Sequence, residues 1–335
     1  MRTTAEILIR PLREDDYATL ARIYNAIYHE ALRTADEMRH EVERVDRRHF
    51  VSEWMVATRA ASGDVIGYAA YHQAPWAYHP NKYRLVQHVD PDYQGRGIGR
   101  RLMDDILSAL GARGAERLHA WAREDHARSV AFLGRYGFAE FARDFESRLD
   151  VAGVDFTRFA GYSDRVAQLG ITITTLAEEL QKNPQCLGAV YQAYCALDVG
   201  APRDTPELPR PDPSTVDEFV TKLVHHPRAL PDAFFLAKLG DFYIGLSMLM
   251  SREGDPALLR QELTGVLAPY RGLGIAMALK VRTIDYAQTR GYSRIGTFNS
   301  SKNDAMLAIN HKLGFVRHPA WMGFSKSLAS SPETH

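Results

Sequence analysis

The stretch VDPDYQGRGIG, residues 89–99, recurs in the chain as VLAPYRGLGIA, residues 266–276. At the same spacing of 177 residues, Val89–Phe138 aligns with Val266–Phe315 without a gap. Of the 50 aligned pairs 12 are identical, whereas ordinary residue frequencies give roughly three by chance. Four of the identical pairs are glycines, which indicate a shared backbone geometry. The 335 residues therefore contain one long unit twice, with a period too long for a solenoid.

The glycines lie between a strand-like segment and an amphipathic helix. In the first copy Ile98, Leu102 and Ile106 recur every four residues and predict one apolar helix face. Backbone N–H groups at a helix N-terminus favour a phosphate, and glycine lets that phosphate approach closely. A turn without a ligand and a dinucleotide site remain alternatives at this point. The dinucleotide pattern, however, needs a third glycine where Arg100 and Met277 stand.

Each half is expected to run strand, two helical segments, hairpin, strand, helix, strand, helix, strand. This order predicts a mixed-sheet α/β (α+β) fold that occurs twice. The two domains are expected at residues 1–150 and 170–335, with a linker at 151–169. The second half carries about 13 extra residues, which we assign to the loop Asp198–Ser214 because it contains five prolines.

The composition is that of a neutral globular chain. It has 41 basic and 41 acidic side chains and 45% apolar residues, which disfavours a nucleic-acid or anionic-membrane binder and excludes wholesale disorder. No apolar run reaches the roughly 18 residues that span a bilayer, and the N-terminus lacks the apolar block of a secretion signal. The two cysteines, Cys186 and Cys195, have no metal-ligand spacing. We therefore expect a cytoplasmic protein without a metal.

Both glycine stretches resemble a known family. Gln94–Gly99 and Arg271–Ala276 match the acetyl-CoA pyrophosphate loop of the GNAT superfamily of N-acetyltransferases, in which Gln or Arg precedes the glycines. The Gly-Phe pairs that begin at Gly137 and Gly314, each after a predicted helix, are similar to that family too. The resemblance covers nearly the whole chain as two fused GNAT domains, similar in layout to the mycothiol synthases. It implies an acetyl-CoA-dependent enzyme in which an amine attacks the thioester directly, in a ternary complex.

The resemblance also implies which residues bind the cofactor. They are Val89, Gln94, Gly95, Arg96, Gly97, Ile98 and Gly99 in the first half, and Val266, Leu267, Arg271, Gly272, Leu273, Gly274, Ile275 and Ala276 in the second. Asn303 matches an asparagine that contacts the pantetheine arm in the family. Asn310, and Leu133 in the first half, replace the family's general-acid tyrosine. The amide of Asn310 is therefore expected to contact the cofactor without donating a catalytic proton.

A catalytic base is expected in the second half. A primary amine has a pKa near 10, so deprotonating it at neutral pH costs roughly 4 kcal/mol and favours a positioned base. Glu262 lies four residues before Val266 on the central strand, and the strand period of two places both on one face. The counterpart of Glu262 is Leu85, so the sequence predicts a catalytic second half and a degenerate first half. A solvated glutamate at a strand edge is the alternative.

The acceptor is expected to be a small-molecule amine. In the family it enters opposite the cofactor, where the proline-rich loop of the second half holds more acids than bases. Asp198 and Asp204 are the candidate contacts, and an ordinary solvated loop is the alternative. Two other functions stay open, a non-catalytic acyl-CoA-binding or sensing protein and a protein N-acetyltransferase. We expect a monomer or a homodimer, and no nucleic-acid or membrane partner.

Overall fold

The computed structural model describes residues 7–29, 32–43, 45–74, 78–199, 215–252 and 254–328. Its contacts divide the chain into two compact units, which are described separately. The first unit holds the described residues up to Ala142 together with residues 321–328, and the second holds those from Arg143 to Ala320. No described helix is long and apolar enough to cross a membrane.

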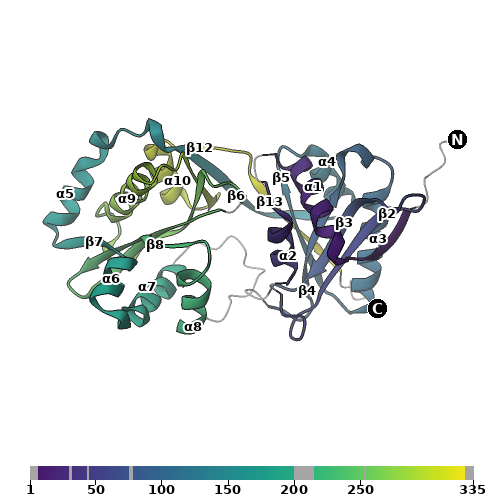
Figure 1. Ribbon diagram of the computed structural model, residues 1–335, viewed down its shortest axis with the longest axis horizontal. Helices are drawn as coiled ribbons and strands as arrows, with labels where there is room; N and C mark the ends of the chain where they lie inside the picture. Colours follow the sequence, from purple (N-terminus) through teal and green to yellow (C-terminus); the bar gives the residue numbers. More distant parts are fainter. Residues whose placement is uncertain are drawn as a thin grey trace, which may run out of the picture. The chain divides into compact units, whose positions relative to one another are not determined.

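The sheet of the first unit has the strand order β1-β2-β3-β4-β5-β13 (Figure 1). Neighbouring strands are antiparallel except for β4 and β5, which run parallel. The strands are β1 (Ile7–Pro11), β2 (Ser52–Arg59), β3 (Val65–His72), β4 (Lys82–Val89), β5 (Arg117–Arg123) and β13 (Trp321–Ser327). The helices are α1 (Tyr17–Ile27), α2 (Ala35–Glu43), α3 (Ile98–Ala112) and α4 (Ala127–Arg135).

The two parallel strands of the first unit separate at the end where α3 begins. Their register runs from the pair Lys82 and Arg117 to the pair Leu85 and Ala120, and it stops there. Beyond that point β4 still pairs with β3 as far as Val89, while β5 pairs with β13 on its other side. The sheet is therefore open between β4 and β5, directly in front of the glycine turn.

The second unit repeats this architecture in the order β6-β11-β10-β9-β8-β7, with β12 paired to β6 (Figure 1). Its strands are β6 (Ala139–Asp150), β7 (Ile171–Thr175), β8 (Ala229–Leu239), β9 (Phe242–Met250), β10 (Leu258–Val266), β11 (Arg294–Ser300) and β12 (Val316–Arg317). Its helices are α5 (Ala160–Gln168), α6 (Leu176–Lys182), α7 (Leu187–Val199), α8 (Val216–Phe219), α9 (Ile275–Thr289) and α10 (Asp304–Leu313). The parallel pair β10 and β11 also stops early, after Gln261 and Thr297.

The last strand of each sequence repeat completes the sheet of the other unit. β6 follows the first repeat but pairs with β11, from Asp144 to Asp150. β13 follows the second repeat but pairs with β5 over its whole length. The two strands end equivalent repeats, so either one covers the open edge of a β5-type strand. A cut in the expected linker at 151–169 would therefore separate both strands from their sheets, and the expected domain boundaries stay a prediction.

The predicted strand–turn–helix is present in both units. α3 begins at Ile98 and α9 at Ile275, each directly after a glycine in the left-handed region, Gly97 with φ 85° and Gly274 with φ 89°. Only glycine adopts that conformation without a steric cost. The apolar face of α3 is buried in the core of the first unit, together with Met322 and Phe324 of β13. Each glycine turn is thus fixed to a sheet by the helix that follows it.

Candidate functional site

Hydrogen bonds of Gln94 hold the first glycine turn, and the space next to its glycines is open. The Gln94 side-chain amide donates to the carbonyl of Val89 at 3.0 Å, and the Arg128 guanidinium donates to Gln94 Oε1 at 2.9 Å. A Cβ added to Gly95 or Gly97 would meet no atom within 4 Å. Backbone N–H groups of the first turn of α3 have no partner within their own helix. The turn therefore presents free donors at an accessible surface, as an anion site requires.

A cavity of about 870 Å³ begins at this turn and extends into the opening between β4 and β5. Gln94, Gly95, Gly97, Ile98 and Gly99 line one end of it, and Val89 lies beside them. The remaining walls come from α1, α2, β2, β3, β4, β5 and α4, and from Trp321 at the start of β13. The predicted residue Arg96 is not part of the wall, because its guanidinium donates to the Asp92 carbonyl at 2.8 Å.

Aromatic and imidazole rings surround Tyr28 in the cavity wall. The ring of His126 stacks on Tyr28 at 5.1 Å between centroids, Trp321 lies at 5.2 Å, and His88 contacts it edge-on at 5.6 Å. Burial lowers the pKa of His88 to about 3, and the positive charges of neighbouring groups act in the same direction. Burial also lowers the pKa of His126 and raises the pKa of Tyr28 well above its usual value. At neutral pH both imidazoles are therefore uncharged and the phenol keeps its proton.

The segment around α2 also contributes to the cavity. Its mixed charges predict a solvent-facing helix, yet Met38 and Val42 are 1% and 2% exposed. Arg33, just before the helix, forms an ion pair with Glu41 in the cavity wall. The prediction of a solvent face is wrong for this side of α2, because apolar residues four positions apart turn it toward the sheet.

Basic side chains surround the first turn and are replaced around the second. Arg96, Arg100, Arg101, Arg128 and Arg135 correspond, at the spacing of 177, to Leu273, Met277, Ala278, Ala305 and Lys312. Arg100, Arg128 and Arg135 line the cavity. These arginines can contact a ligand with several phosphate charges at the first turn, while the second turn has Arg271 where the first has Gln94.

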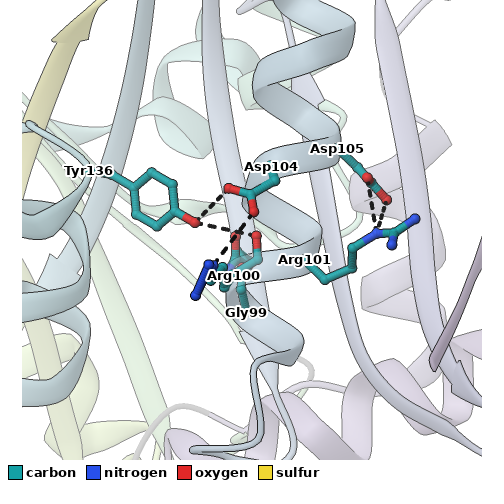
Figure 2. Close-up of polar contacts among 7 residues, drawn as sticks. Gly99, Arg100, Arg101, Asp104, Asp105 and Tyr136 are labelled. Carbon is teal, nitrogen blue, oxygen red and sulfur yellow. Dashed lines mark hydrogen bonds and ion pairs between the residues drawn. The ribbon is translucent and has the colours of Figure 1, made fainter. Parts of the chain in front are cut away.

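Figure 2 shows how the first turn of α3 is held. The Tyr136 hydroxyl donates to Asp104 at 2.8 Å and to the carbonyl of Arg100 at 3.4 Å. The Arg101 guanidinium forms an ion pair with the Asp105 carboxylate at 3.2 Å. The Arg100 guanidinium lies 3.9 Å from the Asp104 carboxylate. Because Tyr136 follows the end of α4, these contacts fix α4 against α3.

The second glycine turn is covered by α5. A Cβ added to Gly274 would lie 3.0 Å from a ring carbon of Tyr162, and the Lys312 ammonium donates to the Tyr162 hydroxyl at 2.5 Å. The predicted cofactor residues Leu273, Ile275 and Ala276 pack in one apolar cluster with Tyr162 and Val166 of α5. A phosphate at this turn would have to displace the Tyr162 ring.

The other residues predicted in the second half already have protein partners. Arg271 donates to the carbonyl of Val266 at 3.0 Å, while Leu267 packs against the apolar cluster beside α7 and Gly272 is exposed. Asn303 caps α10 by accepting from the backbone of Met306 at 3.2 Å, and Asn310 donates to Asn299 Oδ1 at 2.6 Å.

Glu262 forms an ion pair with Arg260 at 2.9 Å, and its side chain is 32% exposed. A β-bulge between Gln261 and Thr264 interrupts the strand there. The strict alternation that would place Glu262 and Val266 on one face therefore does not hold across this point.

The two candidate acceptor contacts are Asp198 and Asp204. Asp198 belongs to α7, but its side chain lies outside the described residues, as does the whole of Asp204.

Cys186 is buried and Cys195 is partly buried, both as free thiols. Within the described ranges no group of three or more His, Cys, Asp or Glu side chains is placed to hold a metal.

The sequence reasoning missed Tyr28, Arg33, Glu41 and Trp321 as site residues. Trp321 is 232 residues from Val89, so only the strand exchange brings it to the cavity. The arginines around the first turn were a usable signal, because their counterparts at the same spacing are apolar or, in one case, lysine.

Comparison with known proteins matches part of the chain to one family. The model of the acetyltransferase (GNAT) family matches residues 17–138. Mycothiol acetyltransferase of Acidothermus cellulolyticus is 26% identical over 243 residues, which cover 69% of this chain and 67% of that protein. That of Frankia alni is 26% identical over 239 residues, with 69% and 66% covered. The chain thus matches about two thirds of the length of these curated relatives.

Two solved structures match nearly the whole chain. A GCN5-related N-acetyltransferase from Sphaerobacter thermophilus has a TM-score of 0.72 and 16% identity, with 98% of both chains covered. A tandem GNAT protein from the clavulanic acid biosynthesis pathway has a TM-score of 0.69 and 18% identity, with 97% and 100% covered. At these identities the likeness shows the fold, and the fold is tandem. Residues 17–138 therefore match the GNAT family of acetyltransferases, whose acyl donor is acetyl-CoA, and the chain as a whole has the fold of a tandem GNAT protein.

Proposed function

We propose that the protein transfers an acetyl group from acetyl-CoA to the primary amine of a small molecule, and that the first unit is where this occurs. The observation that carries the proposal is the cavity that begins at the first glycine turn and continues between β4 and β5. The family model matches residues within this unit. The mycothiol acetyltransferases among the relatives are named for a small-molecule substrate, which supports a small-molecule acceptor here.

The donor set at the turn fits acetyl-CoA. The pyrophosphate would accept hydrogen bonds from the backbone N–H groups of Gly97, Ile98 and Gly99. Because Gly97 has no Cβ, the pyrophosphate can approach the backbone closely there. Arg100 and Arg128 supply positive charge beside it. The pantetheine arm would then lie in the opening between β4 and β5, beyond the point where the two strands stop forming backbone hydrogen bonds with each other. When bound, acetyl-CoA supplies an activated acyl carbon.

Proton transfer is assigned to groups in the cavity wall. The amine must lose its extra proton before it attacks, and the leaving thiolate must gain one. Tyr28 is a protonated phenol in the cavity wall, in contact with His126 and Trp321, so it is our candidate donor to the sulfur. The aromatic wall also excludes water, which favours the neutral form of an incoming amine.

The second unit has a supporting role in this proposal. Its glycine turn packs under Tyr162, and the base predicted there, Glu262, is paired with Arg260. The repeat that forms the second unit ends in β13, which completes the first sheet and contributes Trp321. The assignment of catalysis to the second half remains the sequence-based prediction, and the surroundings of the two turns favour the first.

The test combines cofactor binding with turnover. Titration with acetyl-CoA is expected to give one site per chain, and a panel of amines is expected to release free CoA thiol with at least one of them. Tyr28→Phe should lower kcat by roughly tenfold or more with little change in acetyl-CoA affinity. Binding without amine-dependent thiol release would instead support an acyl-CoA sensor. Two equivalent binding sites per chain would refute the assignment to one unit.

A further inference from the structure

The cavity wall contains a pair of opposite charges beside aromatic side chains. Arg33 and Glu41 form an ion pair there, with side chains 31% and 25% exposed. Tyr24, Trp54 and Tyr68, all less than 8% exposed, line the same wall. Charges in a largely apolar cavity are costly unless they are paired, and a ligand that enters must match them.

The backbone and the ring contacts hold Arg33 in place independently of Glu41. The amide of Asn25 donates to the Arg33 carbonyl at 2.9 Å, and the Arg33 N–H donates to Asn25 Oδ1 at 2.8 Å. Its guanidinium lies 4.3 Å from the centre of the Tyr24 ring. The guanidinium therefore stays in the wall when a ligand replaces Glu41 as its partner.

Other ionisable groups of the cavity wall are engaged or uncharged, and Arg84 among them has a protein partner. Asp125 accepts from the Arg123 guanidinium at 2.7 Å. His88 and His126 are neutral at physiological pH for the reasons given above. A cationic amine therefore finds its opposite charge at Glu41, and an anionic group finds it at Arg33.

We infer that the acceptor is a free α-amino acid with a large apolar or aromatic side chain, whose carboxylate binds Arg33 and whose amine faces Glu41. Such a zwitterion matches both charges at once, whereas a simple amine leaves Arg33 without a second anion. The planar guanidinium suits a carboxylate in particular. The tyrosine and tryptophan rings match the apolar side chain. The inference rests on the proposed acetyl transfer in the first unit.

The reaction balances with these groups. The bond that forms joins the amine nitrogen to the acetyl carbon, and the bond that breaks is the thioester C–S bond. The ammonium loses two protons overall. One passes through Glu41 to solvent, and the other reaches the sulfur, which leaves as the CoA thiol.

The experiment compares three probes that differ only at the carboxyl group, namely phenylalanine, phenylalanine amide and 2-phenylethylamine. Thiol release is expected to show a KM for phenylalanine at least tenfold below those of the other two. Arg33→Met should raise the KM for phenylalanine at least tenfold and change that for 2-phenylethylamine less than twofold. Glu41→Gln should lower kcat for every probe. Arg39→Met is the matched control, because Arg39 pairs with Glu14 and Asp36 on exposed surface outside the cavity.

Two outcomes separate this inference from the proposed function. Equal KM values for the three probes, with thiol release intact, would overturn the amino-acid assignment and leave acetyl transfer standing. If no probe releases thiol, phenylalanine binding is measured by calorimetry with CoA present. Binding that Arg33→Met weakens tenfold and Arg39→Met does not would support the site as an amino-acid site, and no binding would overturn it. Circular dichroism and melting temperature of each variant check that it is folded.

Discussion

Gly97 and Gly274 hold the same left-handed conformation at the start of corresponding helices, yet their surroundings differ. Gly97 borders a cavity, while Gly274 is in contact with Tyr162 of α5. Arginines around the first turn become leucine, methionine and alanine around the second. In the proposed function, the shared backbone geometry of the two turns is separable from ligand binding. Glycine preserves the turn for the fold, and the side chains around it would decide whether an anion is bound.

The strongest test of this difference is a matched pair of substitutions, Gly95→Asp and Gly272→Asp. Both glycines are exposed, with φ of 80° and 79°, and an added Cβ meets no atom within 4 Å at either one. The backbone cost is thus the same in both variants. We expect Gly95→Asp to weaken acetyl-CoA binding by roughly 100-fold, about 2.7 kcal/mol. The added carboxylate would occupy the space beside the phosphates and repel their negative charge. Calorimetric titration of both variants measures it.

Gly272→Asp is expected to leave acetyl-CoA affinity and turnover within twofold of the parent. The reverse pattern, with loss of binding in Gly272→Asp alone, would return the site to the second unit and restore the sequence-based assignment. Equal losses in both variants would mean that each turn binds a cofactor.

A second difference lies inside the helices that follow the turns. Lys280 of α9 is 1% exposed and corresponds to Met103 of α3, which is 0% exposed. The Lys280 ammonium donates a hydrogen bond to Gln261 Oε1 at 3.1 Å. Burial lowers the pKa of Lys280 to about 7. Lys280→Met should therefore raise the free energy of unfolding by a few kcal/mol near pH 6. Urea unfolding measures this gain.

The pH dependence of that gain has a definite sign. The unfolded chain holds the Lys280 proton up to a pKa near 10.4, whereas the folded chain releases it near 7. The parent should thus gain stability between about pH 7 and pH 10, because the unfolded state binds more protons there. The advantage of Lys280→Met should shrink over the same range. Lys302→Met, at an exposed position, should show no such pH dependence.

The arginines around the first turn give a smaller effect. Arg100→Ala combined with Arg128→Ala should weaken acetyl-CoA binding by about 5–10-fold, since exposed charge pairs contribute up to about 1 kcal/mol each. The loss should diminish at high salt, because screening already weakens these contacts in the parent. Arg101→Ala is the control, as Arg101 pairs with Asp105 and does not line the cavity. A salt-independent loss would argue against a role for charge.

These differences show which features the sequence was able to predict. The helix starts at Ile98 and Ile275 follow from glycine and from apolar spacing, which are local signals. The exchange of β6 and β13 was not predictable in this way, because equivalent strands offer the same edge and the choice depends on long-range pairing. The position of α5 over Gly274 depends on packing as well. The catalytic prediction followed one carboxylate, Glu262, whose ion pair with Arg260 is not visible in the sequence.

The smallest expected effect is at Tyr136, which joins α4 to α3 in the first unit. Tyr136→Phe removes the hydrogen bond to Asp104 at 2.8 Å and should lower stability by about 1 kcal/mol. The corresponding pair in the second unit is Leu313 and Val281, where apolar contact replaces the hydrogen bond. If α4 only packs against α3, acetyl-CoA affinity should stay within twofold while the melting temperature falls. A larger loss of affinity than of stability would mean that the hydroxyl helps to order the cofactor site, which is a further feature of the first unit that the second lacks.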